Sequence, residues 1–133
     1  MHGKQNDIPI ILVVDDFEDI RLTLRHWLEK RGYRVVEAED GDKAIEVARQ
    51  VHPALILMDI GMPERSGISA TYKIRKDPEM DGTLIVAITG YQSADLREDA
   101  LTAGCVACLT KPVDLGELDK LVSSLLATTG TSI

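Results

Sequence analysis

Short apolar segments alternate with helix-like segments along most of this chain, and this alternation constrains the fold more than any other feature. Five segments have the length and composition of β-strands, namely IILVV at 10–14, RVVEA at 34–38, ALILM at 54–58, LIVAI at 84–88 and VACL at 106–109. Strands that are separated by helices form parallel sheets, because each right-handed crossover places a helix on one face of the sheet. We therefore predict a doubly wound α/β domain, with a five-stranded parallel sheet and five flanking helices.

Two of the helical segments show clear amphipathic patterns. Within residues 17–31, apolar side chains recur on one helical face, and Gly32 follows as a predicted C-terminal stop. The members of this face are Ile20, Leu24, Trp27 and Leu28. The last helical segment has a similar stripe, formed by Leu118, Leu121, Val122 and Leu125. Both patterns predict helices that cover a sheet with one apolar side.

The charges within the five strand segments predict their order in the sheet. The first, third and fourth segments contain no charged residue, which is typical of interior strands. The second contains Arg34 and Glu37, and the fifth is short, so both are expected at sheet edges. The order 2-1-3-4-5 satisfies both edge assignments, although the sequence does not exclude other orders. In that order ligands bind beyond the carboxyl ends of the first and third strands.

The chain is long enough for one domain and too short for two. It has 133 residues, of which 44% are hydrophobic, and a chain of this size buries a single core. We expect the domain to span residues 8–127, with residues 1–7 and 128–133 as loosely ordered tails.

Charge and cysteine content argue against several classes of protein. The formal net charge of −7 disfavours a nucleic-acid-binding surface and favours cations or basic protein partners. The sequence predicts no membrane span and no signal peptide. Two cysteines, Cys105 and Cys108, predict no disulfide framework and suit a reducing compartment, with the cytoplasm as the expected location. Zinc needs more ligands than this pair offers, so we interpret both as small apolar core residues.

Five polar residues follow the predicted strands, at the end of the sheet where parallel strands terminate. Three of them are carboxylates, Asp15, Asp16 and Asp59, and the other two are Thr89 and Lys111. Carboxylates at one site repel each other unless a cation or an ammonium group offsets their charge. Lys111 supplies one positive charge. Oxygen donors without His or Cys favour a hard divalent ion such as Mg²⁺, which also accepts phosphate oxygens as ligands.

Four motifs carry a resemblance to a known family. VVDDFED, LILMDIGMP, AITG and LTKP, in this order and spacing, resemble the receiver domain of two-component response regulators, the CheY-like family. The resemblance covers nearly the whole chain and implies that Asp59 is the phosphoacceptor. It further implies that Asp16, Asp59 and the backbone carbonyl of Gly61 coordinate Mg²⁺, while Asp15 reaches the ion through a water molecule.

The resemblance also implies roles for the residues around the phosphoacceptor. Lys111 would contact one phosphoryl oxygen and Thr89 would hydrogen-bond another, so both would stabilise the charge that develops during transfer. A cis peptide bond before Pro112 would direct Lys111 into the site.

The function that the resemblance implies is phosphorelay signal transduction. A sensor histidine kinase or a histidine phosphotransfer protein would donate a phosphoryl group from a phosphohistidine to Asp59. The protein, either a single-domain response regulator or the excised receiver of a larger protein, would then bind a downstream protein through the face of helix 4, strand 5 and helix 5. It would assist its own phosphorylation and dephosphorylation and turn over no separate substrate.

Two positions leave alternatives open. Cys108 stands where receivers commonly carry Tyr or Phe, three residues before the lysine, so the aromatic part of the switch is missing there. Tyr91, two residues after Thr89, is a substitute that could cover the phosphoryl group or change rotamer. The alternative function is a pseudo-receiver that binds partners without phosphorylation, against which the complete set of site residues argues. For Asp16, capping of the first helix is a second role, alone or together with metal binding.

Overall fold

One parallel sheet forms the centre of the molecule, seen in a computed structural model that describes residues 8–90 and 94–127. Its strand order is β2-β1-β3-β4-β5, as predicted. The strands are β1 (Ile10–Val14), β2 (Arg34–Ala38), β3 (Leu55–Asp59), β4 (Leu84–Thr89) and β5 (Ala107–Thr110). The third and fifth strands begin one residue later than predicted. The predicted tails, 1–7 and 128–133, lie outside the described residues.

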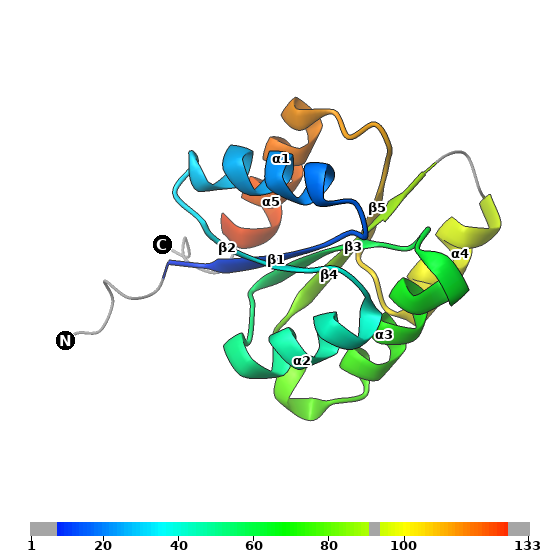
Figure 1. The fold of residues 1–133 in the computed structure, drawn as a ribbon. Coiled ribbons are helices and arrows are strands. Elements are labelled where there is room, and N and C mark those ends of the chain that lie inside the picture. Colours follow the sequence, from blue (N-terminus) through cyan, green and yellow to red (C-terminus); the bar gives the residue numbers. More distant parts are fainter. Residues whose placement is uncertain (1–7, 91–93, 128–133) are drawn as a thin grey trace.

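Five α-helices of the described chain cover the two faces of the sheet. They are α1 (Glu18–Glu29), α2 (Gly41–Val51), α3 (Ser66–Arg75), α4 (Ala94–Ala103) and α5 (Leu115–Ala127), with short 3-10 turns η2 (Pro63–Arg65) and η3 (Pro78–Met80). Figure 1 shows α1 and α5 together on one face, and α2, α3 and α4 on the other. The prediction of a doubly wound domain with five helices is therefore confirmed.

The core consists of two apolar layers, one on each face of the sheet. Successive strand residues point to opposite faces, so Leu12 and Val14 join the layer under α2, α3 and α4, while Ile11 and Val13 join the layer under α1 and α5. Every residue of β3 is buried, whereas β2 and β5 are partly exposed. The strand order places β2 and β5 at the two edges, which confirms the prediction for the charged second segment and the short fifth segment.

The start of α1 differs from the sequence prediction. Its N-cap residue is Phe17 and no side chain caps the helix, so the prediction that Asp16 is the cap is wrong. The backbone N–H of Phe17 instead donates to Asp15 Oδ1 at 2.9 Å. Asp15 thus accepts the N–H of the N-cap residue itself, and Asp16, one position before the N-cap, remains exposed.

Both cysteines belong to the core, as the sequence predicted. Cys105 is buried in the layer under α2, α3 and α4, and Cys108 packs against that layer from β5. Burial raises the pKa of the Cys105 thiol to about 11 and raises the pKa of Cys108 as well. Both thiols are therefore protonated at neutral pH, which opposes reactivity.

Membrane insertion finds no support in the helices of residues 8–90 and 94–127. None of these helices combines the length and apolar composition that a span requires.

Candidate functional site

The carboxyl ends of the strands bring the predicted site residues to one rim of the sheet. Asp15 and Asp16 follow β1, Asp59 is the last residue of β3, Thr89 is the last residue of β4, and Lys111 follows β5 directly. Parallel strands terminate on the same side, and β1 lies next to β3 at the point where the strand order reverses. The structure therefore places all five residues at the same end of the sheet.

Three carboxylates meet at the centre of this rim. Asp15, Asp16 and Asp59 each offer an oxygen, and these oxygens lie within 4.8 Å of one another. Asp15 and Asp59 are only 1% and 3% exposed, whereas Asp16 is exposed. Like charges this close raise the free energy of the ionised state, most strongly where water is excluded.

Lys111 offsets part of the negative charge. Its Nζ lies 2.9 Å from Asp15 Oδ2 and 3.2 Å from Asp59 Oδ2. Burial lowers the pKa of the Lys111 ammonium, but the contacts with the two aspartates outweigh it and raise the pKa overall. The Lys111–Pro112 peptide bond is cis, as the family resemblance implied.

Burial raises the pKa of the Asp59 carboxyl above its ordinary value. The charge of Asp15 acts in the same direction, while the Gly61 N–H and Lys111 act against it. The N–H of Gly61 donates to Asp59 Oδ1 at 2.8 Å, and Lys111 donates to Oδ2. The Lys111 ammonium and the Gly61 N–H therefore do not fully offset the unfavourable free energy of keeping the three carboxylates ionised.

The donor set fits a hard divalent cation. Three carboxylates against one ammonium leave two formal negative charges, and all the ligand atoms of the cluster are oxygens. Such a set is typical of Mg²⁺ sites rather than of zinc or copper sites. Gly61 was predicted to add its carbonyl oxygen; its N–H already contacts Asp59, and the role of its carbonyl stays a prediction.

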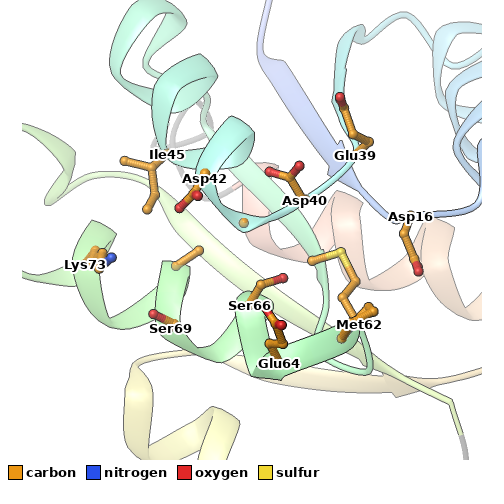
Figure 2. A pocket seen from close by; sticks show the side chains of 13 residues that line it. Asp16, Glu39, Asp40, Asp42, Ile45, Met62, Glu64, Ser66, Ser69 and Lys73 are labelled. Atoms are coloured by element: carbon orange, nitrogen blue, oxygen red, sulfur yellow. The ribbon is translucent and has the colours of Figure 1, made fainter.

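An acidic pocket of about 450 Å³ adjoins the rim. Figure 2 shows Asp16 at one end of this pocket and Lys73 at the other, with residues from the start of α2 and from α3 between them. Its charged lining residues are Asp16, Glu39, Asp40, Asp42, Glu64 and Lys73. Five carboxylates against one ammonium give the approach to Asp16 a negative potential, which raises the local concentration of cations.

Thr89 has a buried hydroxyl that finds no hydrogen-bond partner within the described residues. The residue is 1% exposed. A buried hydroxyl without a partner costs about 1–3 kcal/mol, so its retention at the rim is consistent with a ligand that accepts or donates a hydrogen bond there.

Two residues near the site were not found from sequence. Arg21 donates to the backbone carbonyl of Asp15 at 2.8 Å, and a Cβ at Gly67 would collide with the carbonyl oxygen of Asp59. Neither stands in a motif, so no sequence signal marked them. Of the predicted modulators, Cys108 faces the core, Pro112 follows the cis bond, and Tyr91 lies outside the described residues.

Because the pKa of Asp59 is raised, replacing this residue by a neutral one should stabilise the folded protein, and the size of the effect should depend on pH. Asp59→Asn keeps an oxygen for the Gly61 N–H and removes one charge, so in the presence of a chelator we expect it to raise the free energy of unfolding at about pH 7. Ionisation of Asp59 opposes folding above its folded-state pKa, and this opposition fades as the pH falls toward the ordinary value of 3.8.

Urea unfolding of both proteins at about pH 7 and about pH 5 measures this effect. The advantage of the variant should be smaller at the lower pH. An advantage that grows on acidification would contradict the assignment.

Comparison with known proteins identifies the family. The response regulator receiver domain family matches residues 11–123. The polar-differentiation response regulator DivK of Brucella ovis is 31% identical over 87% of this chain and 94% of its own length. Protein PilH of Pseudomonas aeruginosa is 36% identical over 88% of this chain and 97% of its own length.

Solved structures agree with this match. The chemotaxis protein CheY4 of Vibrio cholerae has a TM-score of 0.83 at 28% identity, covering 90% of this chain and 99% of CheY4. A chain in the Saccharomyces cerevisiae co-crystal structure of the histidine phosphotransfer protein Ypd1 with the receiver domain of Ssk1 has a TM-score of 0.86 at 27% identity, covering 94% of this chain and 93% of that one. The chain therefore belongs to the response regulator receiver domains, the signalling modules of two-component systems.

Proposed function

We propose that Asp59 accepts a phosphoryl group from a phosphohistidine and that this event switches the binding of a partner. The observation that carries the proposal is the position of Asp59, a nearly buried carboxylate at the strand ends with Lys111 3.2 Å away and two further carboxylates beside it. In the reaction a carboxylate oxygen of Asp59 forms a bond to phosphorus, and the bond from phosphorus to the imidazole nitrogen breaks. The imidazole keeps that electron pair and takes a proton from solvent.

Asp16, Asp59 and the Gly61 carbonyl would hold Mg²⁺ directly, with Asp15 acting through a water molecule. Bound Mg²⁺ supplies positive charge that offsets the carboxylates and the phosphoryl oxygens. The oxygen-only donor set and its excess negative charge support this assignment. Asp15 is already engaged by the Phe17 N–H and by Lys111, which is consistent with its more distant role.

Lys111 and Thr89 would act on the phosphoryl group itself. The Gly61 N–H donates to Oδ1 of Asp59, whereas Lys111 donates to Oδ2. The Lys111 ammonium therefore lies beside the carboxylate that forms the new bond to phosphorus. The Thr89 hydroxyl, which lacks a partner among the described residues, would donate to a phosphoryl oxygen. Both contacts stabilise charge on the transferred group.

A histidine kinase or a histidine phosphotransfer protein is the donor class that we propose. Support comes from the similarity to the Ypd1–Ssk1 co-crystal structure and from a groove of about 480 Å³ beside Lys111. Its apolar lining residues are Ile20, Leu24, Pro112, Val113 and Leu115. A helical partner seated there would bring its histidine to the rim.

The downstream partner is proposed to bind the α4–β5–α5 face. Leu101 and Val106 are 52% and 47% exposed on or beside α4 and β5, which is consistent with a protein contact. The chain would act as a receiver domain over residues 8–127, in the cytoplasm, with no turnover of a separate substrate. In this proposal it works either as a single-domain response regulator or as the receiver of a larger protein.

Incubation with acetyl phosphate and Mg²⁺, followed by intact mass measurement, tests the proposal. We expect one phosphoryl group on the native chain, stable in acid and labile in base as an acyl phosphate is. A chelator should prevent its formation. A chain that takes up no phosphoryl group with Mg²⁺ present would contradict the proposal and favour the pseudo-receiver function.

A further inference from the structure

The peptide group that joins Asp15 to Asp16 accepts a hydrogen bond from a residue that the sequence did not predict to belong to the site. Nη1 of Arg21, on α1, donates to the carbonyl oxygen of Asp15 at 2.8 Å. Because a peptide group is planar, the direction of this carbonyl also fixes the N–H of Asp16 and the start of its backbone. The orientation of one aspartate relative to the other thus depends on a hydrogen bond from Arg21.

Arg21 is itself held in place by the sheet. Its Nε lies 3.0 Å from Oε1 of Glu37, and the side chains of the pair are 16% and 18% exposed. Glu37 on β2 precedes Ala38, whose carbonyl accepts the N–H of Asp15 at 3.2 Å. Adjacent residues of β2 therefore hold both sides of the Asp15 backbone, one directly and one through Arg21.

We infer that Arg21 is a positioning residue for the Mg²⁺ site, which it serves by orienting the Asp15–Asp16 peptide group. Arg21 contacts neither the site carboxylates nor the reacting atoms in the described structure; it acts through the backbone. Its planar guanidinium suits this task, because one edge can bond Glu37 while another nitrogen bonds the carbonyl. This inference rests on the proposed function, in which Asp15, Asp16 and Asp59 hold Mg²⁺.

A simple charge effect predicts the opposite result, which makes the inference testable. Arg21 is a cation near a cation site, so by Coulomb repulsion alone its removal would tighten Mg²⁺ binding. If Arg21 orients the ligands, its removal weakens binding, since loss of an outer partner of a metal ligand typically costs about 10–100-fold in affinity. A purely structural role changes the free energy of unfolding and leaves the affinity of the folded protein unchanged.

Arg25 provides a matched control on the same helix. It bonds the other oxygen of Glu37 at 2.8 Å and Glu29 at 3.0 Å, and none of its contacts in the described chain reaches the Asp15–Asp16 loop. Arg25→Gln removes the same charge and a bond to the same glutamate. It therefore shares with Arg21→Gln the loss of one charge from α1 and of one bond to Glu37, and it leaves the bond to the Asp15 carbonyl intact. Arg25 differs from Arg21 in its additional bond to Glu29 and in its greater exposure.

Calorimetric titration with Mg²⁺ of the native chain and three variants is the test. We expect Arg21→Gln to weaken Mg²⁺ binding about tenfold and Arg25→Gln to leave it within about twofold. Arg21→Lys keeps the charge and loses the planar fork, so it should weaken binding and provides a second variant should Arg21→Gln fold poorly. Circular dichroism establishes that each variant is folded.

The outcomes separate the two proposals. Unchanged or tighter binding by both Arg21 variants, with normal binding by the native chain, would overturn the positioning role alone. Equal weakening by Arg21→Gln and Arg25→Gln would also overturn it. A native chain that binds no Mg²⁺ would overturn the proposed function and this inference together.

Discussion

An Asp59→Asn variant is expected to take up no phosphoryl group under conditions in which the native chain takes up one. The amide of asparagine is a poor nucleophile, and the other two carboxylates are badly placed to replace it. Asp15 is engaged by the Phe17 N–H and by Lys111, both at 2.9 Å, and Asp16 is exposed at the rim. Intact mass measurement after incubation with acetyl phosphate and Mg²⁺ gives the result directly.

Two further variants control for the loss of charge. Asp15→Asn and Asp16→Asn each remove one carboxylate and keep Asp59, so each should still take up a phosphoryl group at a reduced rate. Asp16→Asn should weaken Mg²⁺ binding more than Asp15→Asn, because Asp16 is the proposed direct ligand. An equal adduct on Asp59→Asn and the native chain would reject the phosphoacceptor assignment, and the reverse order of Mg²⁺ affinities would reject the division between Asp15 and Asp16.

A Gly67→Ala variant is expected to lose about 2–3 kcal/mol of unfolding free energy. Gly67 lies in the first turn of α3, and a Cβ there would collide with the backbone carbonyl oxygen of Asp59. Backbone cannot move aside as a flexible side chain can, so either α3 or the end of β3 must shift. Alanine favours the helix by up to about 1 kcal/mol over glycine, which is too little to offset the collision.

Gly82→Ala is the matched control for this prediction. Gly82 lies in the turn before β4, and a Cβ there would meet no atom within 4 Å. Its substitution should change the unfolding free energy by less than about 0.5 kcal/mol. Urea unfolding of both variants provides the comparison. Equal stabilities for Gly67→Ala and Gly82→Ala would show that α3 does not depend on this close approach to β3.

The sequence predicted the fold because each local signal agreed with the others. Uncharged strand segments became the interior strands, and Arg34 and Glu37 marked an edge. The site followed from the same logic, since residues at the ends of parallel strands meet whatever their separation along the chain. Asp59 and Lys111 are 52 positions apart and form a contact of 3.2 Å.

Contacts with backbone carbonyl groups could not be predicted from the sequence. Arg21 lies on an amphipathic helix, where an arginine looks like any solvated charge, and its bond to the Asp15 carbonyl depends on the local turn. Gly67 could not be distinguished from other glycines without the distance between α3 and β3. The capping prediction for Asp16 was wrong because the N-cap of α1 is the next residue, Phe17, whose side chain cannot accept a hydrogen bond.

The confinement of the chemistry to one rim leaves the opposite end of the sheet available for labelling. The turns that lead into β2, β3, β4 and β5 lie there, including the turn with the exposed Gly82. A fluorophore or a surface tether attached at that turn would stand a full strand length from Asp59. Single-molecule or immobilised measurements of partner exchange can therefore use this end without obstructing the rim.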